Sequence, residues 1–309
     1  MTASTVIYAN TLAGDTSKRL DGDKLRRIVD AKSLADAFKM LGDYGYGYDP
    51  DGSIDGFIIA ESNKLIEFIE DTAPSARVAE ALLAPYVYNN VKLAYKARFV
   101  EIPLDAYYKT ELDAGRITLG DYNDCDKYLA DALYALDTDA EKRPKSIDLA
   151  ITRAMYKSVL SCPVKAIKNY YRAEIDMKNI LTAARMFRLK VNAATADEFI
   201  EGGTIDFDTL IEAASGKNFA LCFMGTKYED MAERLEKSGF ESLGAFEREA
   251  DDYLFFMTDA LCKKITSYEP YLNYYTEQRI ELKTLKTALV CIKTDTRNLM
   301  YDRIPEIYR

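Results

Sequence analysis

The chain of 309 residues contains no histidine and no tryptophan. Without histidine, the Ser-His-Asp and Cys-His arrangements of nucleophilic catalysis are excluded, and so are nearly all catalytic zinc sites. A GxxxxGK[ST] phosphate-binding loop is also missing from the sequence. We therefore expect no catalytic residue of these types, no nucleotide and no other cofactor.

Cysteine is sparse and badly spaced for metal binding or disulfide formation. The five cysteines include no CxxC pair, and their number is odd. They are Cys125, Cys162, Cys222, Cys262 and Cys291. We interpret them as buried, reduced thiols of a cytoplasmic protein.

Long apolar runs are missing as well. No stretch approaches the ~20 apolar residues that cross a bilayer, and the first thirty residues lack the apolar core of a signal peptide. Acidic residues exceed basic ones, 50 to 41, for a net charge of −9. This sign disfavours nucleic acid and anionic membrane surfaces as partners. Any contact with a membrane is therefore expected to go through another protein, with no direct insertion into lipid.

Proline is scarce, at 8 residues, and glycine amounts to 15, so long helices can continue without interruption. Apolar residues recur at helical spacing in several segments. One such stripe runs through Phe246, Ala250, Tyr253, Leu254, Met257, Leu261 and Ile265. Alternating patterns of β-branched residues are not apparent. The sequence therefore predicts an all-α fold.

The sequence also resembles itself. Asn90, Asn179 and Thr284 each lie on a helix rich in Lys or Arg. Each follows a proline at a similar distance, and these prolines are Pro74, Pro163 and Pro270. Residues 112–117 (LDAGRI) match residues 200–205 (IEGGTI), and residues 41–44 (LGDY) match residues 224–228 (MGTKY).

A period of roughly 90–105 residues is longer than the ~20–50 residues of solenoid repeats. It predicts three similar helical domains arranged with pseudo-threefold symmetry, at residues 1–73, 74–162 and 163–269. Residues 270–309 then form a C-terminal helix. Because the first unit is short at its front, we expect the last helix, at residues 272–299, to pack near that unit.

Basic residues on the repeat helices are candidates for a partner interface. Lys92 and Lys96 are four residues apart and share a helix face. The corresponding basic residues of the other two repeats are Lys178, Arg185, Lys283 and Lys286. They either line a central cavity or form a solvated outer face. Four other residues are interpreted as structural, holding helices within the core: Asn90, Asp176, Asn179 and Glu281.

One short motif is similar to a metal-binding motif of enzymes. Asp251 and Asp252 begin like the DDxxD of helical isoprenoid synthases, which hold magnesium, but Phe255 replaces the third aspartate. The sequence has no second aspartate-rich helix that could share a magnesium site with this one. The other interpretation is a solvated carboxylate face that continues Glu247 and Glu249.

The whole chain resembles the C subunit of the V-type (archaeal and bacterial A/V-type) rotary ATPases, whose eukaryotic equivalent is the d subunit. The likeness lies in the repeated [DE]-x-x-[NT]-hydrophobic motif at residues 176–180 and 281–285, whose first copy has Val87 at the acidic position. The turn at residues 201–205 and the ending RIPEIY at residues 303–308 are also similar to the family.

This resemblance implies a funnel of three helical domains on the cytoplasmic face of a membrane ring of proteolipids. The funnel receives the central stalk, which the D and F subunits form. It acts as a non-catalytic adapter between that shaft and the ring during ATP-linked transport of protons or sodium ions. It binds no nucleotide, ion or small-molecule substrate. The alternatives are a generic helical scaffold, or a magnesium-dependent helical enzyme that uses Asp251 and Asp252.

Overall fold

The computed structural model describes residues 3–15, 20–47, 53–139, 143–191, 194–216, 218–240, 243–301 and 303–309. All regular secondary structure in these ranges is helical, and no strand occurs in them. The predicted all-α fold class is therefore confirmed. No helix of the described chain is both long and apolar enough to span a membrane.

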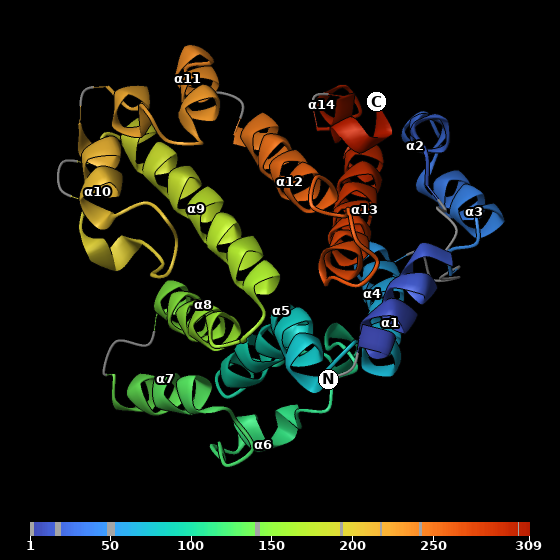
Figure 1. The fold of residues 1–309 in the computed structure, drawn as a ribbon, viewed down its shortest axis with the longest axis horizontal. Helices are drawn as coiled ribbons and strands as arrows, with labels where there is room; N and C mark the ends of the chain where they lie inside the picture. The colour runs from blue at the N-terminus through green and yellow to red at the C-terminus, as the bar shows by residue number, and fades with distance from the viewer. Residues whose placement is uncertain are drawn as a thin grey trace.

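Six long helices form the body of the molecule. They are α4 (Ile54–Thr72), α5 (Ala76–Lys96), α8 (Pro144–Leu160), α9 (Lys165–Arg188), α12 (Leu243–Asp259) and α13 (Glu269–Lys293). Each of these helices contacts the next one in this order, and α13 contacts α4. The six helices thus close into a cycle, in which we distinguish the pairs α5–α8, α9–α12 and α13–α4 (Figure 1).

Shorter helices form a peripheral lobe beside each pair (Figure 1). The first lobe contains α6 (Ala114–Thr118) and α7 (Lys127–Thr138), and the second contains α10 (Phe207–Ser215) and α11 (Glu229–Lys237). The third contains α2 (Gly22–Val29), α3 (Leu34–Asp43) and α14 (Asn298–Tyr301). Helix α1 (Ala3–Asp15) lies against α4 and α13. The 3-10 helices are Leu104–Ala106, Ala196–Glu198, Ala220–Phe223 and Glu306–Tyr308.

Local signals set the helix starts. The hydroxyl groups of Ser53 and Ser75 accept hydrogen bonds from the third backbone N–H of α4 and α5, respectively. The carboxylate of Asp126 does the same at α7. Pro144 and Pro270 stand in the first turn of α8 and α13, where the missing N–H has no intrahelical partner to lose.

Buried apolar side chains form three clusters, and one of them joins the two ends of the chain. In that cluster Leu25 and Phe38 of the N-terminal lobe lie with Leu285 and Leu289 of α13. Helix α13 contacts α1, α2, α3 and α4. The expectation that the last helix packs on the first unit is therefore confirmed. The domain boundaries predicted from the repeats stay a prediction.

Two predicted helices are too long. The last helix ends at Lys293 rather than Leu299, because the chain turns at Asp295, whose φ of 54° is left-handed. The stripe beginning at Phe246 continues in sequence to Ile265, but α12 ends at Asp259. The Asn10 side chain donates hydrogen bonds to the carbonyls of Ile265 and Ser267, which holds that segment in a non-helical path.

The cysteines are free thiols, but only two of the five are buried. Cys162 and Cys291 are buried, whereas Cys125, Cys222 and Cys262 are partly exposed. The interpretation of all five as buried is therefore wrong for three of them. Partial burial still raises the pKa of Cys125 and Cys262 to about 11, so these thiols stay protonated at neutral pH.

Candidate partner interface

The two asparagines of the repeat hold the first and second lobes in the same way. Asn179 of α9 donates a hydrogen bond to the carbonyl of Ile200 (2.8 Å) and accepts one from its N–H (2.9 Å). Asn90 of α5 makes the same two bonds with Tyr108, at 2.8 and 2.9 Å. Each side-chain amide thus satisfies both the N–H and the C=O of one backbone residue. These asparagines position the segment that leads into each lobe.

Asp176 of α9 is fully buried, yet it is surrounded by hydrogen-bond donors. Its oxygens accept bonds from the N–H groups of Thr204 (2.7 Å) and Ile205 (3.2 Å). They also accept bonds from the hydroxyls of Thr204 (2.5 Å) and Tyr228 (2.7 Å). The turn approaches closely enough that a Cβ on Gly203 would lie 2.2 Å from Asp176 Oδ1. A glycine is therefore required at that position.

The equivalent acidic residue of α13, Glu281, is also buried and accepts a hydrogen bond from Tyr46 at 2.7 Å. Tyr46 comes from the N-terminal lobe, just as Tyr228 comes from the second lobe. Tyr228 is the last residue of the matching segment 224–228, whereas Tyr46 lies two residues after the segment 41–44. Both acidic residues of the motif thus anchor a tyrosine of a lobe.

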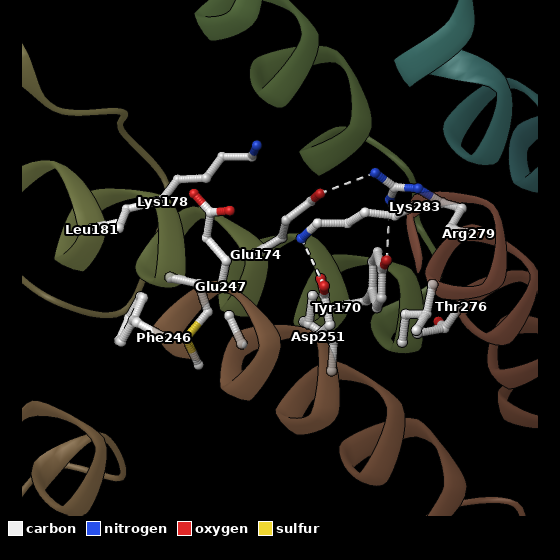
Figure 2. Close-up of a pocket in the computed structure, with 14 residues that line it drawn as sticks. Tyr170, Glu174, Lys178, Leu181, Phe246, Glu247, Asp251, Thr276, Arg279 and Lys283 are labelled. Atoms are coloured by element: carbon white, nitrogen blue, oxygen red, sulfur yellow. Dashed lines mark hydrogen bonds and ion pairs between the residues drawn. The ribbon is translucent and has the colours of Figure 1, made fainter. Parts of the chain in front are cut away.

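A recess of about 380 Å³ lies between α9, α12 and α13, and we call it the three-helix recess. Apolar side chains and charged groups of both signs line it (Figure 2). The lining residues are Tyr170, Glu174, Met177, Lys178, Leu181, Phe246, Glu247, Ala250, Asp251, Leu254, Thr276, Arg279, Ile280 and Lys283. Basic residues of two different repeat helices, Lys178 and Lys283, therefore meet at one recess.

Most charges of the recess are paired within the chain. Arg279 donates to Glu174 (3.2 Å) and Tyr170 (3.1 Å), and Lys283 donates to Asp251 (2.6 Å; Figure 2). Burial alone would raise the pKa of Glu174, but Arg279 and Lys178 outweigh it, so this pKa lies below its ordinary value. Burial dominates at Asp251 and raises its pKa despite Lys283.

Four of the six basic residues predicted for an interface have a carboxylate partner. Besides Lys283, these are Lys96, Arg185 and Lys286, with Asp148 at 2.7 Å, Glu247 at 3.1 Å and Asp55 at 2.8 Å, respectively. Within the described ranges, the one hydrogen bond that Lys92 donates through its side chain goes to the hydroxyl of Thr152, at 2.7 Å. Lys178 is exposed and has no ion-pair partner in the described part of the chain. The six basic residues thus divide into four with a carboxylate partner and two, Lys92 and Lys178, without one in the described part of the chain.

Sequence reasoning did not find Arg279, Glu174 or Tyr170. Arg279 packs on the ring of Tyr275 at 5.5 Å and has the buried rings of Tyr170 and Tyr171 near it. A signal was present, because Glu174 and Lys178 are four residues apart on one helix face. That Arg279 would meet them depends on the crossing of α9 and α13.

Asp251 and Asp252 do not act together. Asp251 binds Lys283 in the three-helix recess, whereas Asp252 accepts a hydrogen bond from the N–H of Glu306 at 2.8 Å. Neighbouring residues of a helix point about 100° apart, so the two carboxylates face different surroundings. No group of three or more His, Cys, Asp or Glu side chains in the described ranges could hold a metal ion. The interpretation as a solvated face is also wrong for Asp252, which is buried.

The fold defines a class of protein: a helical molecule whose six long helices close into a cycle with lobes of shorter helices beside it. The sequence profile of the ATP synthase (C/AC39) subunit family matches residues 14–303, and the chain therefore belongs to this family. It is part of a V-type ATP synthase, as the resemblance implied. A scaffold unrelated to these machines is thereby set aside. No curated protein matches the chain.

Proposed function

We propose that this chain is the non-catalytic central-stalk adapter of a V-type ATPase or ATP synthase. In this role it couples the D–F rotor shaft to the proteolipid ring during transport of protons or sodium ions. The chain then works on the cytoplasmic face of the membrane, held there by the rest of the complex. The closed cycle of six long helices is the observation that carries the proposal, together with membership of the family.

A cycle of packed helices suits the transmission of torque. Each long helix contacts two others, so a force on one pair passes to both neighbouring pairs without reliance on a single flexible connection. In this proposal the three pairs form the wall of a funnel around the end of the shaft. The basic residues Lys92, Lys96, Lys178, Arg185, Lys283 and Lys286 are proposed to belong to its partner interface.

The net charge of −9 supports docking on the ring. Cytoplasmic loops of membrane proteins carry an excess of Lys and Arg, so an acidic cap is complementary to them. This part of the proposal requires that docking weaken between low and moderate ionic strength.

Co-elution of purified components tests the proposal. The full chain is mixed with the D–F shaft and, separately, with the detergent-solubilised ring from the same organism. We expect a complex in both mixtures. A well-folded chain that binds neither would overturn the adapter function. A magnesium-dependent activity that disappears in Asp252→Asn would instead favour the enzyme interpretation.

A further inference from the structure

Two of the six basic residues lack a carboxylate partner in the described part of the chain, and they lie on the two helices that flank α8 in the cycle. Lys92 belongs to α5 and donates to Thr152 of α8, and Lys178 belongs to α9. Burial is the largest effect that lowers the pKa of Lys92, and the charges of Lys178 and Lys96 lower it further. Asp148 opposes all three effects, but it already pairs with Lys96. The site therefore holds an excess of positive charge.

This excess is a cost to the isolated chain. An ammonium group that is partly removed from water, with a second ammonium group nearby, is destabilised unless an anion compensates it. The Thr152 hydroxyl is dipolar and does not cancel the charge of Lys92. The other basic residues of the three-helix recess are neutralised by Glu174 and Asp251. An anion from outside would thus find its counter-charge at Lys92 and Lys178.

Apolar surface adjoins this charge. Lys178 is at the edge of the three-helix recess, which Met177, Leu181, Phe246 and Leu254 line with apolar side chains. A recess of about 380 Å³ has room for one or two large apolar side chains of a protein. A free inorganic anion would leave this surface uncovered, whereas a peptide segment fills it.

We infer that Lys92, Lys178 and the three-helix recess form one docking site for an acidic segment of the rotor shaft, with carboxylates at the lysines and an apolar side chain in the recess. The inference rests on the proposed function, and it specifies that ion pairs and apolar packing bind the shaft to the chain. The other four basic residues are occupied within the chain and contribute less to this contact.

Equilibrium binding of the full chain to the D–F shaft at low and moderate salt tests the inference. Lys92→Met and Lys178→Met remove one charge each and keep the apolar part of the side chain. Each is expected to weaken binding about three- to tenfold at low salt, and the double variant more than either, with a smaller dependence on salt. Lys237→Met in the peripheral helix α11 is the matched control, because it removes the same charge from an exposed position.

The stability of the free chain supplies a second readout. Removal of an uncompensated charge is expected to leave the melting temperature of Lys92→Met unchanged or higher, whereas loss of a structural contact would lower it. A markedly lower melting temperature would therefore contradict the inference. So would equal affinity of the double variant and the wild type, or an equal loss in Lys237→Met.

The same measurements separate this inference from the proposed function. If the wild type binds the shaft and the double variant binds equally well, only the docking site is wrong. If the wild type binds neither shaft nor ring, the adapter function fails, and the docking site fails with it. If the double variant lost binding to the ring and kept binding to the shaft, the two lysines would contact the ring, and the docking site for the shaft would be wrong.

Discussion

The lobes beside α5 and α9 are held alike at one position of the repeat and differently at another. Asn90 and Asn179 make the same pair of hydrogen bonds to the backbone of the following loop. Three residues earlier, α9 carries the buried Asp176, whereas α5 carries Val87, which packs against the large apolar cluster. The amide contact is common to both units, and the carboxylate is not.

The difference shows what a buried carboxylate requires. Asp176 accepts four hydrogen bonds, two of them from the backbone of a glycine-containing turn and one from Tyr228. Desolvation of a charge is offset only when such donors are complete. At Val87 an apolar contact takes the place of these bonds. The same position of a repeat can thus be stabilised either by a complete set of hydrogen bonds to a carboxylate or by apolar packing.

Removal of the carboxylate should have the largest effect on this comparison. In Asp176→Ala the buried hydroxyl of Tyr228 and the part-buried donors of Thr204 lose their acceptor, and we expect a loss of about 3–5 kcal/mol in the free energy of unfolding. Urea unfolding measures it. Asp131→Ala, at an exposed position of α7, is the control and should change stability by less than about 0.5 kcal/mol. Equal effects of the two substitutions would show that the network adds no stability.

The reverse change, Val87→Asp, places a carboxylate where the repeat has apolar packing. It should cost about 1–3 kcal/mol, because the new charge at this partly buried position is partly desolvated without the donors that Asp176 has. Val87→Ala separates the charge from the loss of packing and should cost about 1 kcal/mol. Both values come from urea unfolding. If the aspartate were tolerated as well as the alanine, the α5 unit would contain donors able to satisfy the new carboxylate.

The two asparagines allow a matched test of the shared contact. Asn179→Ala and Asn90→Ala should each lower the free energy of unfolding by about 1–3 kcal/mol. The effect should be larger for Asn179, because its bonds to Ile200 are buried and those of Asn90 are partly exposed. Hydrogen exchange of the Ile200 and Tyr108 amides reports the same loss locally. A larger effect at Asn90 would contradict this ranking.

Asp252 gives the smallest effect and a contrast to Asp176, because among the described residues one backbone N–H and Arg248, at 3.4 Å, are its hydrogen-bond donors. Burial raises its pKa from 3.8 to about 6. The folded state therefore binds this proton more tightly than the unfolded state. Its contribution to stability is complete below about pH 3.8 and is lost as the pH rises through about 6.

In Asp252→Asn this part of the pH dependence should disappear, while the amide oxygen still accepts from the N–H of Glu306. The free energy of unfolding, measured from pH 4 to pH 7 in steps, gives the two profiles. The wild-type profile should fall more steeply with pH than that of the variant near pH 6. Parallel profiles would mean that Asp252 titrates alike in the folded and unfolded states.

The helices and their repetition could be read from the sequence. The spacing of apolar residues predicted long amphipathic helices, and the self-similarity around Asn90, Asn179 and Thr284 predicted three related units. Helix ends were less accurate at residues 265 and 299. There the apolar period continues while Asn10 and the left-handed Asp295 end the helical path.

The basic residues of the interface show a similar limit. The sequence identified Lys92, Lys178 and Lys283 as candidates, but it did not separate those with a carboxylate partner from those without one. Partners such as Asp251 and Thr152 come from other helices, so pairing depends on how the helices cross. The docking site we infer follows from that pairing and not from the lysines alone.

By itself, the sequence determined the helical fold, predicted three related units and excluded histidine-based chemistry, because these depend on composition and on local periodicity. The tertiary structure alone decided which charges are compensated and which lobe belongs to which long helix. The third lobe combines the N-terminal helices with α13, since the segments that complete its core lie at opposite ends of the chain. Contacts between such distant segments are set by packing, which no local pattern records.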